Sequence, residues 1–399
     1  MAAMDLVKLL EFSVRQEASD LVLKANQPPI FRIHGDLVRM KIDPLSADDV
    51  RETCYGILTP EQVQVFENTL ELDFAYELGT LSRFRGNMMV QRGRVTGCYR
   101  TIPTTIRTIE DLGLPEICVK LADQPRGLVL VTGPTGSGKT TTLAAMIDYV
   151  NSRKPVHILT VEDPIEYVQP CKQALINQRE VHEDTKSFAN ALKFALRQDP
   201  DVILIGEMRD LETIHLAITA AETGHLVFGT LHTTDAVQTV DRVIDVFPPH
   251  QQQQIRMQLS VNLVGVLSQA LVKTRDLNGR VAAFETMEAL PSIRNMIREG
   301  KTHQIASSIQ TGSKRGMYSL DQSLATLVRR GIADPDSARS KATSIEEFDE
   351  LVTEETEIAG ATTLEAGDGP RTATADAREA AQRADFQQRL KDRRGGGGH

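Results

Sequence analysis

Residues 133–140 carry the clearest chemical pattern in this sequence, GPTGSGKT, which matches the phosphate-binding motif G-x-x-x-x-G-K-[ST] at every fixed position. In such a loop the glycines let backbone N–H groups turn onto the β-phosphate, at the positive end of the following helix. Lys139 is expected to reach the β- and γ-phosphates of ATP, and the hydroxyl of Thr140 to bind Mg²⁺. The predicted nucleotide-binding residues are Gly133, Pro134, Thr135, Gly136, Ser137, Gly138, Lys139, Thr140 and Thr141.

The sequence on either side of this loop has the pattern that the motif requires. An apolar, β-branched run at 127–132 predicts a buried strand before it. Apolar residues recur at helical spacing after it, namely Leu143, Met146, Ile147 and Val150. A glycine-rich turn that matches the motif by chance is the alternative, and this strand-loop-helix context disfavours it. ATP and Mg²⁺ are therefore the predicted cofactors.

Three carboxylates follow apolar runs further along the chain. Glu162 and Asp163 follow one run, and Glu207 follows another. Phosphoryl transfer needs positioning, Mg²⁺ and a group that orients or deprotonates water. We predict that Glu162 activates the water, and that Glu207 and Asp163 join Thr140 around the metal. Gly206 occupies the position where the second motif of such ATPases normally carries an aspartate. Acids that merely end strands are the alternative, which three such acids in one chain disfavour.

The elements that must position these residues are strands that alternate with helices along the sequence, and each strand ends in a polar residue. That pattern predicts a parallel sheet with its site along one edge, and we interpret it as a RecA-like α/β domain. The runs expected to form its strands are 127–132, 157–161, 202–205 and 226–231, the last of which precedes His232. Residues 251–272 have helical spacing and predict one long helix, followed by a strand at 280–285 and helices from 291 to about 351.

The first hundred residues predict a separate, smaller α/β unit. It should begin with a helix at 6–14, contain a helical stretch at 48–66 that Pro60 interrupts, and include several short strands. A polar, proline-bounded connector should follow and act as a hinge. The tail is poor in large apolar side chains and should be mostly disordered. The predicted domains are 1–103, a linker at 104–117, a nucleotide domain at 118–353 and the tail at 354–399.

Composition excludes several classes of protein. The net charge of −9 argues against a broad nucleic-acid interface, which normally shows a basic excess. No apolar run approaches the roughly 20 residues needed to cross a bilayer, so we expect no direct membrane insertion. The four cysteines are widely scattered, without the C-x-x-C pairs of a zinc or redox site. We expect a cytoplasmic protein that reaches the membrane only through partners.

Taken together, the motifs resemble those of the secretion and type IV pilus motor ATPases over roughly residues 4 to 352. Within that family the chain is similar to the retraction motors of twitching motility. The segment at 292–299 resembles the retraction motif, with Ser292 and Met296 in place of the usual Ala and Leu. The other segments that carry the resemblance are ASDL at 18–21 with the prolines at 28–29, the phosphate loop, VEDPIE at 161–166, IGEMRD at 205–210, and 220–233 with its histidines.

The resemblance implies a homohexameric ring whose subunits pair a PAS-like N-terminal domain with the RecA-like domain and hold ATP between them. It implies that Arg85 and Arg100 approach the triphosphate and that His232 senses the γ-phosphate, whereas His225 is as readily interpreted as a structural histidine. It also implies pilus machinery as the partner, with an inner-membrane platform protein that receives the force at the cytoplasmic side. On the helix expected at 292–299, Arg294 and Arg298 should lie on a face away from the apolar side and transmit force.

Two other functions fit parts of the pattern. An extension or type II secretion ATPase typically carries an additional N-terminal domain and a tetracysteine insertion, and neither is found in this sequence. A non-hydrolysing nucleotide-dependent scaffold would be expected to have lost its water-activating acids, whereas Glu162 and Glu207 are both present. A nucleic-acid motor is disfavoured by the charge.

Overall fold

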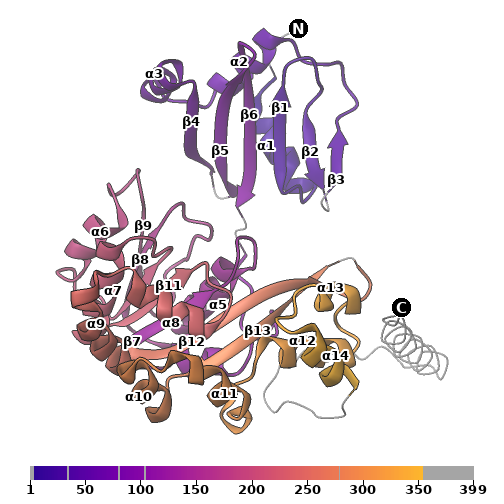
Figure 1. The fold of residues 1–399 in the computed structure, drawn as a ribbon. Helices are drawn as coiled ribbons and strands as arrows, with labels where there is room; N and C mark the ends of the chain where they lie inside the picture. Colours follow the sequence, from indigo (N-terminus) through magenta and orange to yellow (C-terminus); the bar gives the residue numbers. More distant parts are fainter. Residues whose placement is uncertain (1–3, 34–35, 80, 103–104, 278, 354–399) are drawn as a thin grey trace. The chain divides into compact units, whose positions relative to one another are not determined.

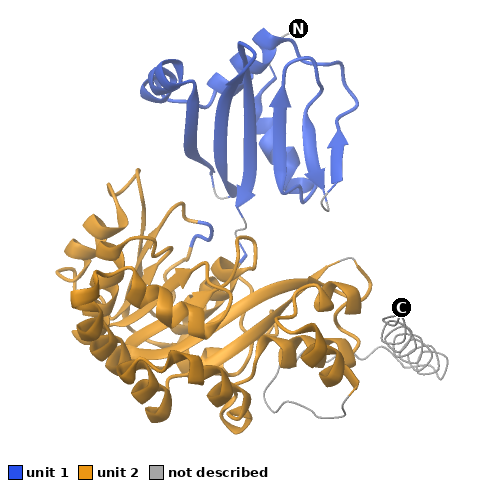
Figure 2. Cartoon of the chain, in the orientation of Figure 1, with its two compact units in different colours: residues 1–105, 166–168 blue, residues 106–165, 169–399 orange. Residues whose placement is uncertain are grey.

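The computed structural model describes residues 4–33, 36–79, 81–102, 105–277 and 279–353, and the chain forms two compact units (Figure 1). Figure 2 shows unit 1, which consists of residues 1–105 and 166–168, and unit 2, which consists of 106–165 and 169–399. The domain bounds expected from the sequence remain predictions. The expected disordered tail at 354–399 lies outside the described residues.

Unit 1 is built on a six-stranded antiparallel sheet in the order β3-β2-β1-β6-β5-β4. Thr59 caps the N-terminus of helix α3, because its side chain accepts a hydrogen bond from the Gln62 N–H while the Gln62 side chain accepts one from the Thr59 N–H. Pro60 then occupies the first helical turn, so the predicted interruption there is confirmed. The elements are α1 Leu6–Arg15, β1 Asp20–Lys24, β2 Ile30–Ile33, β3 Asp36–Arg39, α2 Ala47–Tyr55, α3 Pro60–Thr69, β4 Glu71–Leu78, β5 Ser82–Gln91 and β6 Arg94–Ile102.

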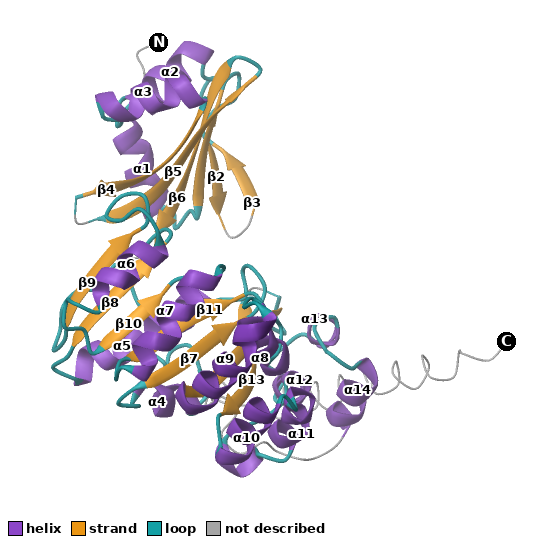
Figure 3. Ribbon diagram, turned by 60° about the vertical axis from the view of Figure 1, so that its left-hand side comes forward, coloured by secondary structure: helices purple, strands orange, loops and turns teal. Residues whose placement is uncertain are grey.

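Unit 2 contains a seven-stranded sheet in the order β13-β12-β7-β11-β10-β8-β9, in which only the pairing of β13 with β12 is antiparallel. The central strands β7, β10 and β11 are buried at every position, because helices cover both faces of a parallel sheet (Figure 3). The strands are β7 Gly127–Thr132, β8 His157–Glu162, β9 Leu175–Glu180, β10 Val202–Ile205, β11 Leu226–Leu231, β12 Leu263–Lys273 and β13 Arg280–Glu288. The expected α/β fold class is confirmed.

Helices fill the connections between these strands and the region that follows the sheet. Those beside the sheet are α4 Ile117–Ala122, α5 Lys139–Arg153, α6 Phe188–Ala195, α7 Leu211–Glu222, α8 Ala236–Asp245 and α9 Pro249–Asn262. The region after the sheet contains α10 Pro291–Glu299, α11 Ile305–Gln310, α12 Leu320–Arg329, α13 Pro335–Arg339 and α14 Ile345–Thr353, as the sequence predicted. Within the described residues, none of these helices combines the length and apolar character needed to span a bilayer.

The single helix expected at 251–272 is wrong. Helix α9 ends at Asn262 and the chain continues as strand β12, which lies between β7 and β13. Nearly every residue of β12 is buried, so the period of two that reveals a half-exposed strand is absent from the sequence. A buried strand that directly follows a helix therefore reads as a continuation of that helix.

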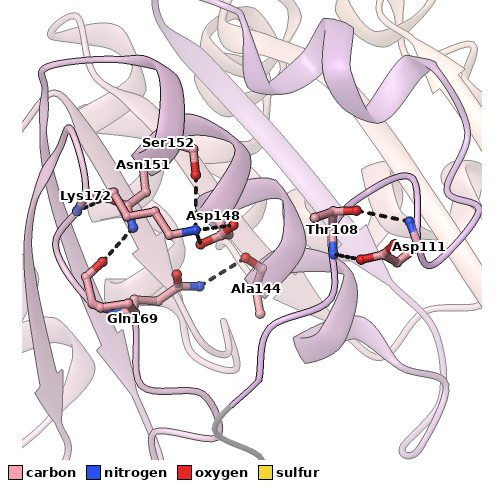
Figure 4. Close-up of polar contacts among 9 residues, drawn as sticks. Thr108, Asp111, Ala144, Asp148, Asn151, Ser152, Gln169 and Lys172 are labelled. Carbon is pink, nitrogen blue, oxygen red and sulfur yellow. Dashed lines mark hydrogen bonds and ion pairs between the residues drawn. The ribbon is translucent and has the colours of Figure 1, made fainter.

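The segment expected to be a flexible connector contributes to the core of unit 2. Ile109 and Leu114 are buried among core residues of that unit. Thr108 and Asp111 exchange hydrogen bonds between side chain and backbone, at 3.2 and 3.1 Å, and fix a turn that contains Ile109 and precedes Leu114 (Figure 4). Residues 105–115 are thus ordered by burial as well as by local hydrogen bonds.

Helix α10 packs through its apolar side as predicted, but one of its two arginines does not lie on the outer face that the sequence predicted. Ile293 and Ile297 are fully buried, with Leu290 and Met296 packed beside them. Arg294 turns inward instead of facing outward. Its guanidinium donates to the Ala289 carbonyl at 2.7 Å and to carbonyls at the end of α9, those of Ser260 and Val261. Unpaired carbonyls at a helix C-terminus favour such a cation, so Arg294 joins two helices.

Candidate active site

The phosphate loop has the backbone that its glycines predict. Gly133, Gly136 and Gly138 have φ angles of 140°, 76° and 92°, which residues with a side chain rarely adopt. At Gly133 a Cβ atom would also lie 2.3 Å from the carbonyl oxygen of Gln269. Helix α5 begins directly after the loop at Lys139. The Lys139 ammonium group donates to the carbonyls of Gly133 at 2.8 Å and Pro134 at 3.2 Å, so it lies over the loop.

The carboxyl ends of four neighbouring parallel strands place the other predicted residues along the same edge of the sheet. The strands lie in the order β7, β11, β10 and β8, about 4.8 Å apart. The phosphate loop follows β7, His232 follows β11, Glu207 lies two residues beyond the end of β10, and Glu162 is the last residue of β8. The sequence therefore correctly indicated one edge for these groups, while their individual roles remain predictions.

Glu207 lies at the centre of a small charged cluster. Its Oε1 atom is 2.6 Å from His232 Nε2 and 2.5 Å from Arg209 Nε. Burial by itself raises the pKa of Glu207, but the hydrogen bond from Arg209 and the attraction of His232 outweigh burial and hold the pKa below its ordinary value. Glu207 is therefore a carboxylate at neutral pH, paired with the histidine of the adjacent strand end.

Glu162 is buried and its orientation is fixed by hydrogen bonds. Its Oε1 atom accepts hydrogen bonds from the Thr160 hydroxyl at 2.7 Å and from the Gln178 amide at 3.1 Å. A Cβ atom at Gly206 would lie 3.2 Å from the Cα atom of Glu162. A side chain at position 206 would therefore require Glu162 to shift by a few tenths of an ångström, and glycine avoids this shift.

Asp163 and Glu207 line a common pocket with a volume of about 390 Å³. Its wall also includes the cationic side chains Lys186 and Arg209. Asp210 and Glu212 also line it, so the pocket combines four carboxylates with two cations and is predominantly acidic.

The loop after the acidic segment is tied to the phosphate-loop helix (Figure 4). The Lys172 ammonium group donates to both carboxylate oxygens of Asp148 on α5, at 2.6 and 2.8 Å. The Gln169 amide donates to the Ala144 carbonyl of the same helix at 3.0 Å, and Asn151 exchanges hydrogen bonds with the loop backbone. These contacts hold residues 169–172 against α5.

Arg85 and Arg100 belong to unit 1, where they lie opposite each other on adjacent strands. Arg100 donates to Asp20 at 3.0 Å, and this hydrogen bond raises the pKa of the arginine. Arg85 lies 3.9 Å from Asp73. Both arginine side chains are exposed and share one face of the sheet. Their predicted approach to ATP stays a prediction.

The sequence analysis missed the polar residues of β12, because that strand was read as a helix. The Gln269 amide, which is buried, donates to the Ser137 carbonyl of the phosphate loop at 2.6 Å. The neighbouring Ser268 accepts a hydrogen bond at 2.9 Å from Thr132, the last residue before the loop. Two adjacent polar residues inside an otherwise apolar run were the available signal.

Gln269→Leu is expected to weaken ADP binding about tenfold, because the Ser137 carbonyl would lose its buried donor and the loop would lose a support. Titration of the purified variant with a fluorescent ADP analogue measures this effect. Gln254→Leu, at an exposed position of α9, is the matched control. Wild-type affinity in Gln269→Leu would mean that the loop holds its shape without this contact.

This site is that of a P-loop ATPase. A glycine loop joins a strand to a helix, and carboxylates and a histidine lie on the same edge of the parallel sheet. Comparison with known proteins narrows the class. The family model "Type II/IV secretion system protein" matches residues 109–334, and the chain belongs to this family. Its relatives include ATPases of type IV pilus retraction, and the predicted family, ATPase activity and role in pilus retraction are confirmed.

Two curated relatives and one solved structure are especially similar. The type IV pilus retraction ATPase PilT of Pseudomonas aeruginosa is 53% identical, with 86% of this chain and 100% of that protein covered. A twitching motility protein of Neisseria gonorrhoeae is 52% identical, with coverage of 86% and 92%. The crystal structure of the pilus retraction motor PilT with bound ADP has a TM-score of 0.81 and 43% identity, with coverage of 86% and 98%.

Proposed function

We propose that this chain is one subunit of a homohexameric ring that hydrolyses ATP to withdraw type IV pili. The observation that carries the proposal is the row formed by the phosphate loop, His232, Glu207 and Glu162 along one edge of the sheet of unit 2. One phosphate loop per chain supplies one site, so continuous work on a filament calls for several chains in a closed ring.

In the proposed site, Lys139 neutralises the β- and γ-phosphates and Glu162 orients the attacking water. His232 senses the γ-phosphate through its pairing with Glu207. The described residues contain no cluster of three or more His, Cys, Asp or Glu side chains able to hold a metal ion alone. Mg²⁺ usually takes one or two carboxylates together with the phosphates of its nucleotide, and Thr140, Glu207 and Asp163 are a donor set of this kind. The metal would neutralise charge on the phosphates.

The exposed pair Arg85 and Arg100 would meet the triphosphate when the two units close on ATP. Guanidinium groups suit this role because they bind phosphate oxygens in a bidentate manner. The mass of the purified protein in the presence of ATP, compared between wild type and the Arg85→Ala, Arg100→Ala variant, tests both the ring and the contribution of the arginines. A monomer with full ATPase activity would contradict both.

The ring would work in the cytoplasm, at the inner membrane, where a platform protein of the pilus machinery receives its force. The decisive experiment is deletion of the gene. Cells without a retraction motor should carry surface pili that cannot withdraw, whereas cells without an extension motor should be bald. Bald cells would therefore favour the extension ATPase as the function.

Arg298→Ala is expected to abolish pilus withdrawal while ATP hydrolysis continues. Arg298 is exposed on α10 and contacts only the nearby Asn295 among the hydrogen bonds described for it, so a partner can grip it. Twitching of cells and ATPase activity of purified protein measure the two functions separately. Arg315→Ala, another exposed arginine, should leave both intact.

Arg294→Ala is the less informative substitution, because Arg294 holds α10 against α9. It should lower thermal stability as well as motility. An equal loss of ATPase activity and motility in Arg298→Ala, with the fold intact, would place α10 in the catalytic apparatus instead.

A further inference from the structure

The start of helix α8 lies directly after the His232 segment and is held by a carboxylate from another part of the sheet. Glu285, on strand β13, accepts a hydrogen bond from the Ala236 N–H at 2.7 Å. Ala236 is the first residue of α8, and only three residues separate it from His232. A negative charge is stabilising at a helix N-terminus, where unpaired N–H groups and the helix dipole both favour it.

A second set of contacts, made by buried hydroxyl groups, stabilises the turn between His232 and the start of α8. The Thr239 hydroxyl lies 2.7 Å from the Thr233 hydroxyl and 2.6 Å from the Asp235 carbonyl. It also lies 3.4 Å from the hydroxyl of Thr132, the residue before the phosphate loop. Thr132 and Thr239 are fully buried. The segment that carries His232 is therefore anchored to the fold rather than hanging free at the sheet edge.

Glu285 is a largely buried carboxyl group in acidic surroundings. Burial, the largest cause, and the nearby acids Asp235 and Asp321 together raise its pKa to about 7 against the opposing effect of the hydrogen bond from Ala236. Asp235 caps α8 and Asp321 comes from α12, so the charged groups that face Glu285 are both acidic. Because these effects outweigh the favourable helix N-terminus, the charged form of Glu285 costs stability, which points to a use other than stability.

We propose that Glu285 is a positioning residue for ATP hydrolysis, which fixes the start of α8 and through it the pairing of His232 with Glu207. The inference rests on the proposed roles of His232 and Glu207. The carboxylate is 2.7 Å from the helix N–H it serves, and His232 Nε2 is 2.6 Å from Glu207. If the start of α8 shifts, this second contact loosens, and a small misplacement of a catalytic group lowers the rate steeply.

Glu285→Ala should lower kcat about tenfold at pH 8 and leave the KM for ATP unchanged, because the phosphate loop keeps its own contacts. Glu285→Gln keeps an acceptor for the Ala236 N–H but cannot ionise. At pH 8 it should have the lower kcat that wild type reaches as Glu285 takes up a proton below about pH 7, and it should lack that component of the wild-type pH profile. Glu288→Gln, on the same strand but paired with Lys120 at the surface, is the matched control.

Thermal stability provides an independent readout, because Glu285→Gln is expected to raise the Tm although it lowers kcat. The folded-state pKa lies above the ordinary value of 4.5, so the favourable contribution of protonated Glu285 is complete below pH 4.5 and is lost as the pH rises to about 7. The Tm of Glu285→Gln relative to wild type should therefore rise across this interval. If Glu285 had only a structural role, Glu285→Gln would show this gain in Tm but would leave the pH profile of kcat unchanged.

Amide hydrogen exchange of residues 232–239 decides where the effect originates. A loss of kcat in Glu285→Ala together with faster exchange in this segment supports the proposal. Normal kcat in that variant overturns it, and so does a loss of kcat with unchanged exchange at 232–239. The variant His232→Ala distinguishes a failure of the proposed function from a failure of this inference. If His232→Ala is fully active, the proposed role of His232 is wrong. If His232→Ala is inactive and Glu285→Ala is fully active, only the inference about Glu285 is wrong.

Discussion

Glu162→Gln is expected to lower the rate of ATP hydrolysis at least about a hundredfold while nucleotide binding stays close to normal. The carboxylate of Glu162 is buried and oriented by Thr160 and Gln178, so it is held ready to take part in the reaction. A general base contributes roughly two to four orders of magnitude to a rate. The amide of glutamine keeps an acceptor for both donors but cannot take up the proton of water, so the loss falls on kcat.

The measurement is kcat at saturating ATP, combined with an equilibrium titration with ADP. Glu183→Gln, at an exposed turn after β9, is the control and should behave as wild type. Glu207→Ala is also expected to retain binding and lose turnover, because it removes the partner of His232. Normal turnover in Glu162→Gln, with turnover lost in Glu207→Ala, would transfer the role of water activator to Glu207.

The phosphate loop could be predicted from the sequence because backbone geometry determines which residues it accepts. Gly133, Gly136 and Gly138 all have positive φ angles, so the glycines of the motif are a direct consequence of the loop conformation. The acids at the strand ends were also readable, since parallel strands bring their carboxyl ends to one edge. These features depend on local structure and on the direction of the strands.

The residues that the sequence did not reveal are those whose roles depend on a long-range contact. Gln269 supports a loop more than a hundred residues before it in the chain, at Ser137, and was assigned to a helix. Glu285 on β13 meets Ala236, 49 residues earlier in the chain. Arg294 looked like a surface charge by helical spacing, yet carbonyls at the end of α9 attract it inward. Spacing along one element cannot show which neighbouring element supplies a partner.

Lys139→Ala is expected to weaken ADP binding by about 10- to 100-fold and to reduce ATP turnover even further. A hydrogen bond to a charged group contributes about 1.5–3 kcal/mol, which corresponds to this range of affinity. Lys139 lies over the phosphate loop, where its ammonium group already meets two carbonyls of the loop, at 2.8 and 3.2 Å. Phosphate oxygens are stronger acceptors than these carbonyls, so bound nucleotide should draw the ammonium group to itself.

The control lies at the other end of the same helix. Lys154 pairs with Asp123 and donates to the Ala122 carbonyl, remote in sequence from the phosphate loop, so Lys154→Ala should bind ADP normally. Equal melting temperatures of Lys139→Ala and wild type without nucleotide would establish that the fold is intact. Normal ADP affinity in Lys139→Ala would mean that the ammonium group acts only on the γ-phosphate. The substitution would then resemble Glu162→Gln, with turnover lost and binding kept. Lys139 would in that case belong with the acids as a group that acts in catalysis, and ADP binding would depend on the rest of the phosphate loop.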